Sequence, residues 1–272
     1  IVNVHYYAHV IRLMGHNGYI QSLARGIRER SSDFRFDTFS KQHLPVPPLP
    51  EQERIVAYLD KQTAKVDALI KAKTEQMALL KELRERTIAD AVTRGLPSEH
   101  TSFKSTNIPW LPEIPVSWEM RRSASLLKVK DAISAPNAEL LSVFLDRGVI
   151  KFSEGGEKRA NATSKDLTKY QEVCSGEFVM NNQQAWRGSV GVSPYYGIVS
   201  PAYIVATISS SLSVQYANHL LRSNPLVGLY EVCSRGVGSI QRNLIWNLFK
   251  SKHLPVPPLS EQERIVAYLD KQ

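Results

Sequence analysis

The sequence contains no long hydrophobic run and few cysteines. No stretch of 18 apolar residues occurs among the 272, so a membrane-spanning helix is not expected. The two cysteines, Cys174 and Cys233, are too few for a disulfide framework and predict buried thiols in a reducing compartment. The chain also lacks an initiating methionine and a signal peptide, so we expect it to begin inside a longer gene product.

Motifs for catalysis and cofactor binding are absent as well. There is no glycine-rich phosphate loop, and Gly236-Val237-Gly238 lacks the third glycine of a dinucleotide fingerprint. His5 and His9 stand four residues apart, but no nearby Cys or acidic residue completes a metal site. The two "VPPL" stretches lack the polar and aromatic residues of an adenine-methyltransferase motif and are interpreted as rigid extended connectors. We therefore predict no catalytic residue, metal or cofactor in this chain.

Positive charge is the first informative feature that is present. Lys and Arg number 34 against 26 Asp and Glu, which gives a net charge of +8 and a pI near 9.4. Such a balance favours a polyanionic partner, of which nucleic acid is the commonest.

The second informative feature is a nearly perfect internal repeat. "HLPVPPLPEQERIVAYLDKQ" (residues 43–62) returns as "HLPVPPLSEQERIVAYLDKQ" (residues 253–272), with 19 of 20 positions identical and only Pro50 replaced by Ser260. We call these stretches the first and the second motif copy. Upstream of each copy the same offset of 210 pairs only scattered residues, among them His9 with His219. One part of the repeat is fixed while the adjoining part varies. A complete second period predicts a parent of about 420 residues.

A long helix is predicted from Leu49 to about Val92. Pro50 and Glu51 suit a helix N-terminus, apolar residues then recur about every 3.7 positions, and Gly95 with Pro97 ends the pattern. About 40 residues give a helix of roughly 60 Å. A helix of this length with one apolar stripe needs a partner helix, and the natural partner is the helix that begins in the second motif copy, running antiparallel. The alternative is an ordinary helix packed on a globular domain.

Residues 98–252 have a different texture. Short β-branched and aromatic runs such as "LLSVFL", "GEFVM" and "AYIVATI" alternate with Gly, Pro, Asn and Ser, and predict strands. One or two helices, broken at Asn224-Pro225, follow Ser211. We therefore expect an α+β fold of mixed sheet and short helices joined to a long helix.

Polar, aromatic and basic residues gather in three segments suited to nucleic-acid contact: residues 180–205, residues 234–242 and a lysine-rich loop. Each has a plainer interpretation, since Trp186, Tyr195 and Tyr203 are more often core residues and a lysine loop can be a solvated face. Base or groove contacts are predicted for Gln183, Gln184, Arg187, Ser189, Tyr196, Gln241 and Arg242, and phosphate contacts for Lys158, Arg159, Lys165, Lys169 and Arg235.

Three stretches in order, "IPWLPEIPVSWEMRR", "QAWRGSVGVSPYYGIVSPAY" and "LPVPPLSEQERIVAYLD", resemble the specificity (S) subunit of type I restriction-modification enzymes. The resemblance covers residues 43–272 well and residues 1–42 more weakly. It implies two DNA-recognition domains held apart by two antiparallel helices, which read a bipartite target with an unread spacer. The segments would be the end of a first recognition domain (1–42), a spacer helix region (43–97), a second recognition domain (98–252) and the start of a second helix (253–272).

The resemblance also implies partners. Two methyltransferase (M) subunits would bind the duplicated motif, restriction (R) subunits would complete the complex, and S-adenosylmethionine and ATP with Mg²⁺ would sit on those partners in a prokaryotic cytoplasm. Predicted docking residues are Leu44, Pro47, Pro48, Leu49, Gln52 and Ile55, with Leu254, Pro257, Pro258, Leu259, Gln262 and Ile265.

Alternatives remain open at this point. The chain can be a truncated subunit that acts as a dimer, a coiled-coil scaffold that binds only protein, or part of an enzyme whose active site lies outside this sequence.

Overall fold

The chain was analysed as a computed structural model, which describes residues 2–24, 34–96, 99–131, 135, 137–155, 166–237 and 241–271. It divides into two compact units, Ile1–Leu79 (unit 1) and Leu80–Gln272 (unit 2), and each is described by itself. Across the described ranges, no helix is both long and apolar enough to cross a lipid bilayer. Cys233 is buried and Cys174 is half-buried, and both are free thiols.

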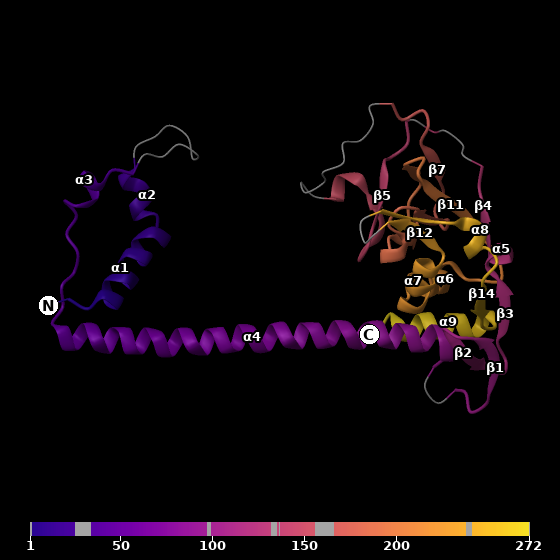
Figure 1. Ribbon diagram of the computed structural model, residues 1–272, viewed down its shortest axis with the longest axis horizontal. Helices are drawn as coiled ribbons and strands as arrows, with labels where there is room; N and C mark the ends of the chain where they lie inside the picture. The colour runs from indigo at the N-terminus through magenta and orange to yellow at the C-terminus, as the bar shows by residue number, and fades with distance from the viewer. Residues whose placement is uncertain are drawn as a thin grey trace. The chain divides into compact units, whose positions relative to one another are not determined.

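The predicted long helix is α4, Leu49–Arg94, whose 46 residues exceed the expected 40 (Figure 1). Glu51 lies in its first turn, where a carboxylate is stabilised by the helix dipole. The helix ends where Gly95 adopts a left-handed φ of +82°, which an L side chain rarely tolerates. Its apolar stripe is largely open to solvent, with Val66, Leu69, Ile70 and Met77 each more than half exposed.

Unit 1 contains three short helices and the first part of α4. The short helices are α1 (Val4–His16), α2 (Tyr19–Leu23) and α3 (Phe36–Phe39). Asn3 caps α1, since its side chain accepts hydrogen bonds from the backbone N–H groups of His5 and Tyr6. The backbone N–H of Asn3 in turn donates to Oε1 of Gln52 at 2.8 Å, so the start of α1 is tied to the start of α4.

Unit 2 is built on a four-stranded antiparallel sheet in the order β4-β11-β8-β9, with a core on each face. Phe178 and Met180 of β8 point into one core with α6 and α7, whereas Val179 points into the other. This alternation is the period of two that a strand imposes. The sheet strands are β4 (Leu127–Val129), β8 (Phe178–Asn181), β9 (Val190–Val192) and β11 (Tyr203–Ile208), and the second core also contains β5 (Leu141–Phe144), β6 (Gly148–Lys151), β7 (Gln171–Val173) and β10 (Gly197–Val199).

Smaller elements complete unit 2, and the α+β prediction is confirmed. The predicted helix break lies at Ser223, between α6 (Val214–Arg222) and α7 (Asn224–Val232). The hairpin of β1 with β2 was not predicted. The remaining elements are β1 (Phe103–Ile108), β2 (Leu111–Pro115), β3 (Glu119–Arg122), α5 (Ser123–Leu126), η1 (Phe152–Gly155), η2 (Ala185–Arg187), β12 (Ser234–Val237), β13 (Gln241–Leu244), α8 (Trp246–Phe249), β14 (His253–Val256) and α9 (Leu259–Leu269).

The sequence repeat is also a repeat of contacts. In unit 2 the backbone N–H of Ser213, the N-cap of α6, donates to Oε1 of Gln262 at 2.8 Å, as Asn3 does to Gln52 in unit 1. The Gln262 amide also donates to the Pro257 carbonyl at 2.9 Å, and the Gln52 amide donates to the Pro47 carbonyl at 2.7 Å. Each glutamine therefore joins the start of a neighbouring helix, α1 or α6, to a motif copy.

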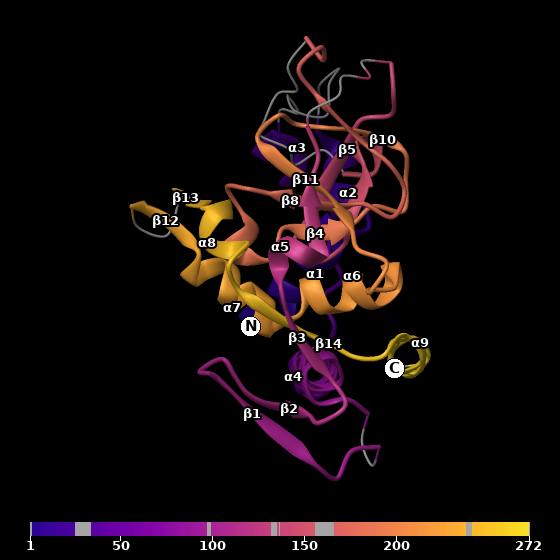
Figure 2. The same cartoon turned by 90° about the vertical axis from the view of Figure 1, so that its right-hand side faces the viewer.

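The two motif copies differ in one respect. In the second copy, residues 253–256 form β14, which pairs antiparallel with β3, and the two strands run side by side in Figures 1 and 2. In the first copy, residues 43–48 are not in a strand in the part of unit 1 that the structure describes. The connector prediction did not include a strand, and Val256 of "VPPL" is the last residue of β14 because β3 supplies a pairing partner there.

Replacing Gln262 by Ala should lower the free energy of unfolding of unit 2 by about 1–3 kcal/mol. The side chain is fully buried, and its loss leaves the N–H of Ser213 and the carbonyls of Ser211 and Pro257 without their partner. Urea unfolding of the purified chain measures this, with Glu263→Ala on the exposed side of α9 as the control. Equal stability of the two variants would contradict the assigned role.

Unit 2 should also lose stability as the pH falls below about 6.5. Burial is the largest influence on His219 and lowers its pKa below the usual 6.5, with Asp270 opposing and Arg222 reinforcing the effect. The 3.8 Å contact with Asp270 is therefore not an ion pair at pH 7. Because the unfolded chain binds the proton first, the neutral imidazole stabilises the fold above pH 6.5, and this contribution is lost at lower pH.

The His219→Gln variant should consequently lose less stability than the wild type between pH 7.5 and pH 5.5 in thermal unfolding. His5→Gln, at an exposed position, serves as the control. An identical acid-induced loss in wild type and His219→Gln would rule out His219 as the source.

Candidate nucleic-acid interface

Two arginines from different elements lie against one tryptophan in unit 2. Trp186 belongs to η2, and its indole N–H donates to the Gln183 carbonyl at 3.2 Å, which holds the ring at the surface. The guanidinium of Arg242, in β13, lies 5.0 Å from the ring centroid, and that of Arg187 lies 5.8 Å from it. Both distances are within the range of cation–π attraction.

An acidic side chain from a third element completes this arrangement. Nη1 of Arg242 donates to Oε1 of Glu231, in α7, at 2.7 Å. The hairpin of β12 with β13 is tied to the loop before η2, because the backbone N–H of Leu244 donates to the Asn182 carbonyl at 3.1 Å. We call Trp186, Arg187, Arg242 and Glu231 the Trp186 cluster. It presents two guanidinium groups beside one aromatic ring, and that of Arg242 is also paired with a carboxylate.

Several predicted base-contact residues belong to this region. Gln183 and Arg187 are exposed, and Gln184 is half-buried with its Oε1 3.5 Å from Nη1 of Arg187. Gly188 follows with a φ of +91°, a left-handed conformation that ends the 3₁₀ turn and returns the chain into β9. The backbone of Gln241 lies in β13 beside Arg242, while its side chain is outside the described part.

Ser189 does not fit the prediction. Its side chain is 3% exposed, and the hydroxyl donates to the Val143 carbonyl at 3.0 Å. The hydroxyl therefore closes the second core and does not face solvent. The sequence placed Ser189 among polar loop residues, but the start of β9 turns it inward.

Tyr196 belongs to a separate polar cluster. Its exposed phenol donates to Oε1 of Glu172 at 3.0 Å, a hydrogen bond that raises the pKa of Tyr196 and keeps the phenol protonated. Lys130 lies 3.0 Å from Glu177 and 3.7 Å from Glu172. Burial lowers the pKa of Lys130, but the carboxylates raise it more, so the ammonium group is charged.

The predicted phosphate contacts are only partly described. Lys158, Arg159 and Lys165 lie outside the described residues. Lys169 and Arg235 are both exposed, Arg235 on β12 next to the Trp186 cluster in the β12–β13 register, where it pairs with Asn243. Exposed cationic side chains of this kind can contact the phosphates of a nucleic-acid backbone.

The predicted docking residues divide into buried and accessible ones. Gln52, Leu254, Pro257, Gln262 and Ile265 are buried against their own chain, so they serve the internal joints and not a partner. The tertiary fold decides this, because each motif helix needs an inward face. The accessible set comprises the exposed Pro48, Pro258 and Leu259, and the half-buried Leu44, Pro47, Leu49 and Ile55.

The sequence analysis did not predict a buried hydrogen-bond cluster around Glu261, at the start of α9. The Glu261 carboxylate is 3% exposed and accepts hydrogen bonds from the Trp118 indole at 2.8 Å and the His100 imidazole at 2.6 Å. A side chain at Gly95 would collide with His100. Nearby, Arg264 forms a bidentate pair with Glu99 at 3.1 Å. Glu99, His100 and Glu261 also have ligand atoms within 4.8 Å, a spacing suited to a metal, but these hydrogen bonds already account for the cluster.

The identical residues of the first copy are open. Glu51 and Arg54, the counterparts of Glu261 and Arg264, are both exposed, and Ile55 is only half-buried where Ile265 is fully buried. The motif helix is therefore covered at the Glu261 side in unit 2, whereas the equivalent side, at Glu51, is exposed in unit 1. Trp118, within the quoted "IPVSWEMRR", was the available signal for this hydrogen-bond cluster.

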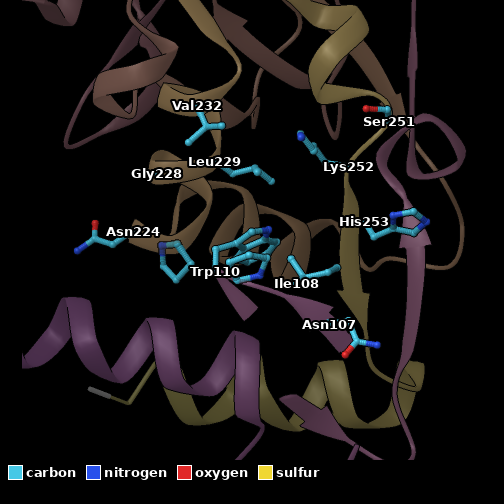
Figure 3. Close-up of a pocket in the computed structure, with 12 residues that line it drawn as sticks. Asn107, Ile108, Trp110, Asn224, Gly228, Leu229, Val232, Ser251, Lys252 and His253 are labelled. Carbon is cyan, nitrogen blue, oxygen red and sulfur yellow. The ribbon is translucent and has the colours of Figure 1, made fainter. Parts of the chain in front are cut away.

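An apolar cavity of about 760 Å³ lies in unit 2 between the β1–β2 turn, α7 and residues 251–253. Figure 3 shows Trp110 and Ile108 on one side and Leu229 and Val232 on the other. This lining suits an apolar side chain and not a polyanion, and no residue predicted to contact DNA belongs to it.

The comparisons with known proteins agree with this architecture. The profile of the family described as "Type I restriction modification DNA specificity domain" matches residues 19–78. Over 250 residues the chain is 24% identical to the specificity subunit of the type I restriction enzyme MjaVIII of Methanocaldococcus jannaschii, covering 85% of this chain and 55% of that protein. Both matches are to specificity subunits of type I restriction-modification enzymes, and the chain is similar to them.

Other relatives are more distant in sequence but similar in fold. The EcoKI specificity subunit of Escherichia coli K12 is 22% identical over 97% of this chain and 57% of its own length. The HsdS subunit of Thermoanaerobacter tengcongensis superposes with a TM-score of 0.55 at 17% identity, over 99% of this chain and 62% of that one. A chain from a structure of a type I R-M system superposes with a TM-score of 0.60 at 18% sequence identity. The match covers 94% of the present chain and 59% of that chain. The present chain thus spans just over half the length of these relatives.

Replacing Trp118 by Phe should lower the free energy of unfolding of unit 2 by about 1.5–3 kcal/mol, because the ring is kept while a buried carboxylate loses an N–H donor. Denaturant unfolding measures this. The matched control is Trp110→Phe at the half-buried hairpin turn, which should change stability far less. A Trp118→Phe protein as stable as the control would show that the indole N–H is dispensable.

Proposed function

We propose that the chain is a non-catalytic DNA-recognition and assembly component of a type I restriction-modification enzyme. The Trp186 cluster carries this proposal, since two oriented guanidinium groups occupy the surface of a recognition unit in a protein of net charge +8. Arginine is the residue that most often reads guanine, through paired hydrogen bonds to O6 and N7. A DNA partner would place the protein in the cytoplasm.

Specific residues take different parts in this reading. Arg187 and Arg242 would contact base edges, and the amides of Gln183, Gln184 and Gln241 are suited to adenine. Tyr196 would contact the groove or backbone from its separate cluster. Lys169 and Arg235, with Lys158, Arg159 and Lys165, would hold phosphates and fix the register on the duplex without conferring sequence preference.

The duplicated joints support a bipartite target. Each copy ties a helix of a different recognition domain to the same motif through one buried glutamine, so the scaffold is constant while the readers differ. Two unlike readers on one scaffold recognise two unlike half-sites separated by unread base pairs. The four segments 1–42, 43–97, 98–252 and 253–272 keep their proposed roles as recognition domain, spacer helix, recognition domain and second helix.

Protein partners are supported by the exposed apolar side chains of α4. Val66, Leu69, Ile70 and Met77 lie along a helix that cannot gain its stability from an uncovered stripe. An antiparallel second helix would cover it, and two M subunits would dock on the accessible motif residues Leu44, Pro47, Pro48, Leu49, Ile55, Pro258 and Leu259. In this proposal methyl transfer, with S-adenosylmethionine, belongs to the M subunits, and ATP-driven cleavage belongs to R subunits.

A protein-only scaffold is the second candidate, and the same exposed stripe favours it. A single experiment separates the two functions. The chain is co-expressed with the methyltransferase encoded beside it, purified, and incubated with random-sequence duplex DNA at two salt concentrations. A complex that holds methyltransferase and enriches a defined sequence supports the proposal. A complex without any sequence enrichment leaves the scaffold function, and the absence of both binding activities contradicts both.

Replacing Arg242 by Ala should cost about 1–3 kcal/mol of binding to the enriched sequence and relax the preference at one base pair. Binding to the enriched duplex and to single-base variants of it measures this. Lys169→Ala is the matched comparison, because a phosphate contact should weaken binding to all sequences equally and reduce the salt dependence. Equal weakening by Arg242→Ala on every sequence would move Arg242 to the phosphate class.

A further inference from the structure

The Trp186 cluster contains one residue whose charge opposes DNA binding. Glu231 lies in α7 and is about half exposed, with its carboxylate 2.7 Å from Nη1 of Arg242. A surface ion pair of this kind contributes little to the stability of a fold. Its electrostatic cost is larger for a protein that approaches a polyanion. Stability therefore does not explain why a carboxylate stands at the reading surface.

Orientation does explain it. A long arginine side chain has many rotamers, and an unrestrained guanidinium contacts phosphates and bases without distinction. Reading guanine requires a planar fork presented edge-on to two acceptors. The Trp186 ring, 5.0 Å from the Arg242 guanidinium, restrains its plane, and the Glu231 carboxylate restrains its rotation within that plane. Two contacts from two elements thus restrict the orientations open to Arg242.

We propose that Trp186 and Glu231 are the specificity-determining residues of unit 2, which position Arg242 to read a single guanine. This inference rests on the proposed DNA-recognition function. The Trp186 ring packs against the Arg242 guanidinium. The ring is itself held by the hydrogen bond from its indole N–H to the Gln183 carbonyl. Glu231 acts as an acidic restraint that reduces general affinity for DNA and increases discrimination among sequences.

The proposal has a signature that a structural role would not produce. Replacing Glu231 by Gln removes a negative charge and loosens Arg242. Binding to random duplex DNA should therefore stay equal or become tighter, and its salt slope should steepen by up to about one. At the same time the preference for guanine at one position should fall by about tenfold. A variant that merely disturbs the fold would weaken both kinds of binding together.

The chain offers a matched control. Arg94 donates from Nη2 to Oε1 of Glu113 at 2.7 Å and lies 5.5 Å from the ring centroid of Phe103. This triplet repeats the carboxylate–arginine–aromatic chemistry elsewhere in unit 2. Glu113→Gln therefore removes the same charge from the same kind of pair and should leave the guanine preference unchanged.

The experiment is a selection from a random duplex library, in the complex with methyltransferase, with wild type, Glu231→Gln, Glu113→Gln, Trp186→Phe and Trp186→Ala. Salt titrations on random and enriched DNA accompany it. Trp186→Phe keeps an aromatic plane and should retain the preference within about twofold, while Trp186→Ala should lose about tenfold. Thermal unfolding of each variant identifies any loss of folding, and Glu231→Gln, at a surface position, decides the matter if Trp186→Ala does not fold.

The outcomes are distinct. Loss of one guanine preference in Glu231→Gln, with undiminished binding to random DNA, supports the proposal. An unchanged preference, or a parallel loss on all sequences, overturns it and leaves the DNA-recognition function intact. If the wild type selects no sequence, the proposed function itself fails, and the assignment of Trp186 and Glu231 fails with it.

Discussion

The architecture of this protein depends on one buried side-chain amide, used twice. Gln52 and Gln262 each accept a hydrogen bond from the N-cap residue of a neighbouring helix, α1 or α6, and donate one to a proline carbonyl of their own motif copy. Both side chains are fully buried, so an unmade bond would cost the whole desolvation penalty of a backbone group. This requirement explains why the motif stays constant while the domains that it holds vary. Only the cap position and the glutamine have to match.

The outer face of the same motif shows how identical sequences can have different environments. In the second copy Glu261 accepts hydrogen bonds from Trp118 and His100, and its carboxylate is withdrawn from water. In the first copy Glu51 is exposed, although only the preceding residue, Pro50 in place of Ser260, differs between the copies. A fixed sequence on an exposed face is expected when that face is also a binding surface. The inward face therefore accounts for part of the conservation between copies, and the outward face leaves room for partner binding.

In unit 2 the elements that support the Trp186 cluster differ from the contacts that orient its arginine. The four-stranded sheet is covered on both faces, and the loop between β8 and β9 extends from it. Trp186 and Arg242 meet because the backbone of Leu244 is bonded to that of Asn182. Guanidinium groups held by a plane and a carboxylate can discriminate, whereas mobile ones only attract. On such a surface, charge would supply affinity for DNA and the fixed orientation of the arginine would supply discrimination among sequences.

The sequence alone was enough to predict the long helix, short strands within residues 98–252, the break before Pro225 and the repeat, because periodicity, turn residues and identity are local or linear signals. Residue chemistry alone also predicted base contacts for Arg187 and Arg242, which the structure places beside the same tryptophan. Only the tertiary structure decided that Ser189 is turned into a core, that Gln262 and Ile265 face inward, and that residues 253–256 form a strand while residues 43–46 do not. It also placed Glu231, from a helix with no polar motif, beside Arg242. These outcomes depend on segments far apart in the chain, since a β-strand needs its partner and a buried carboxylate needs its donors.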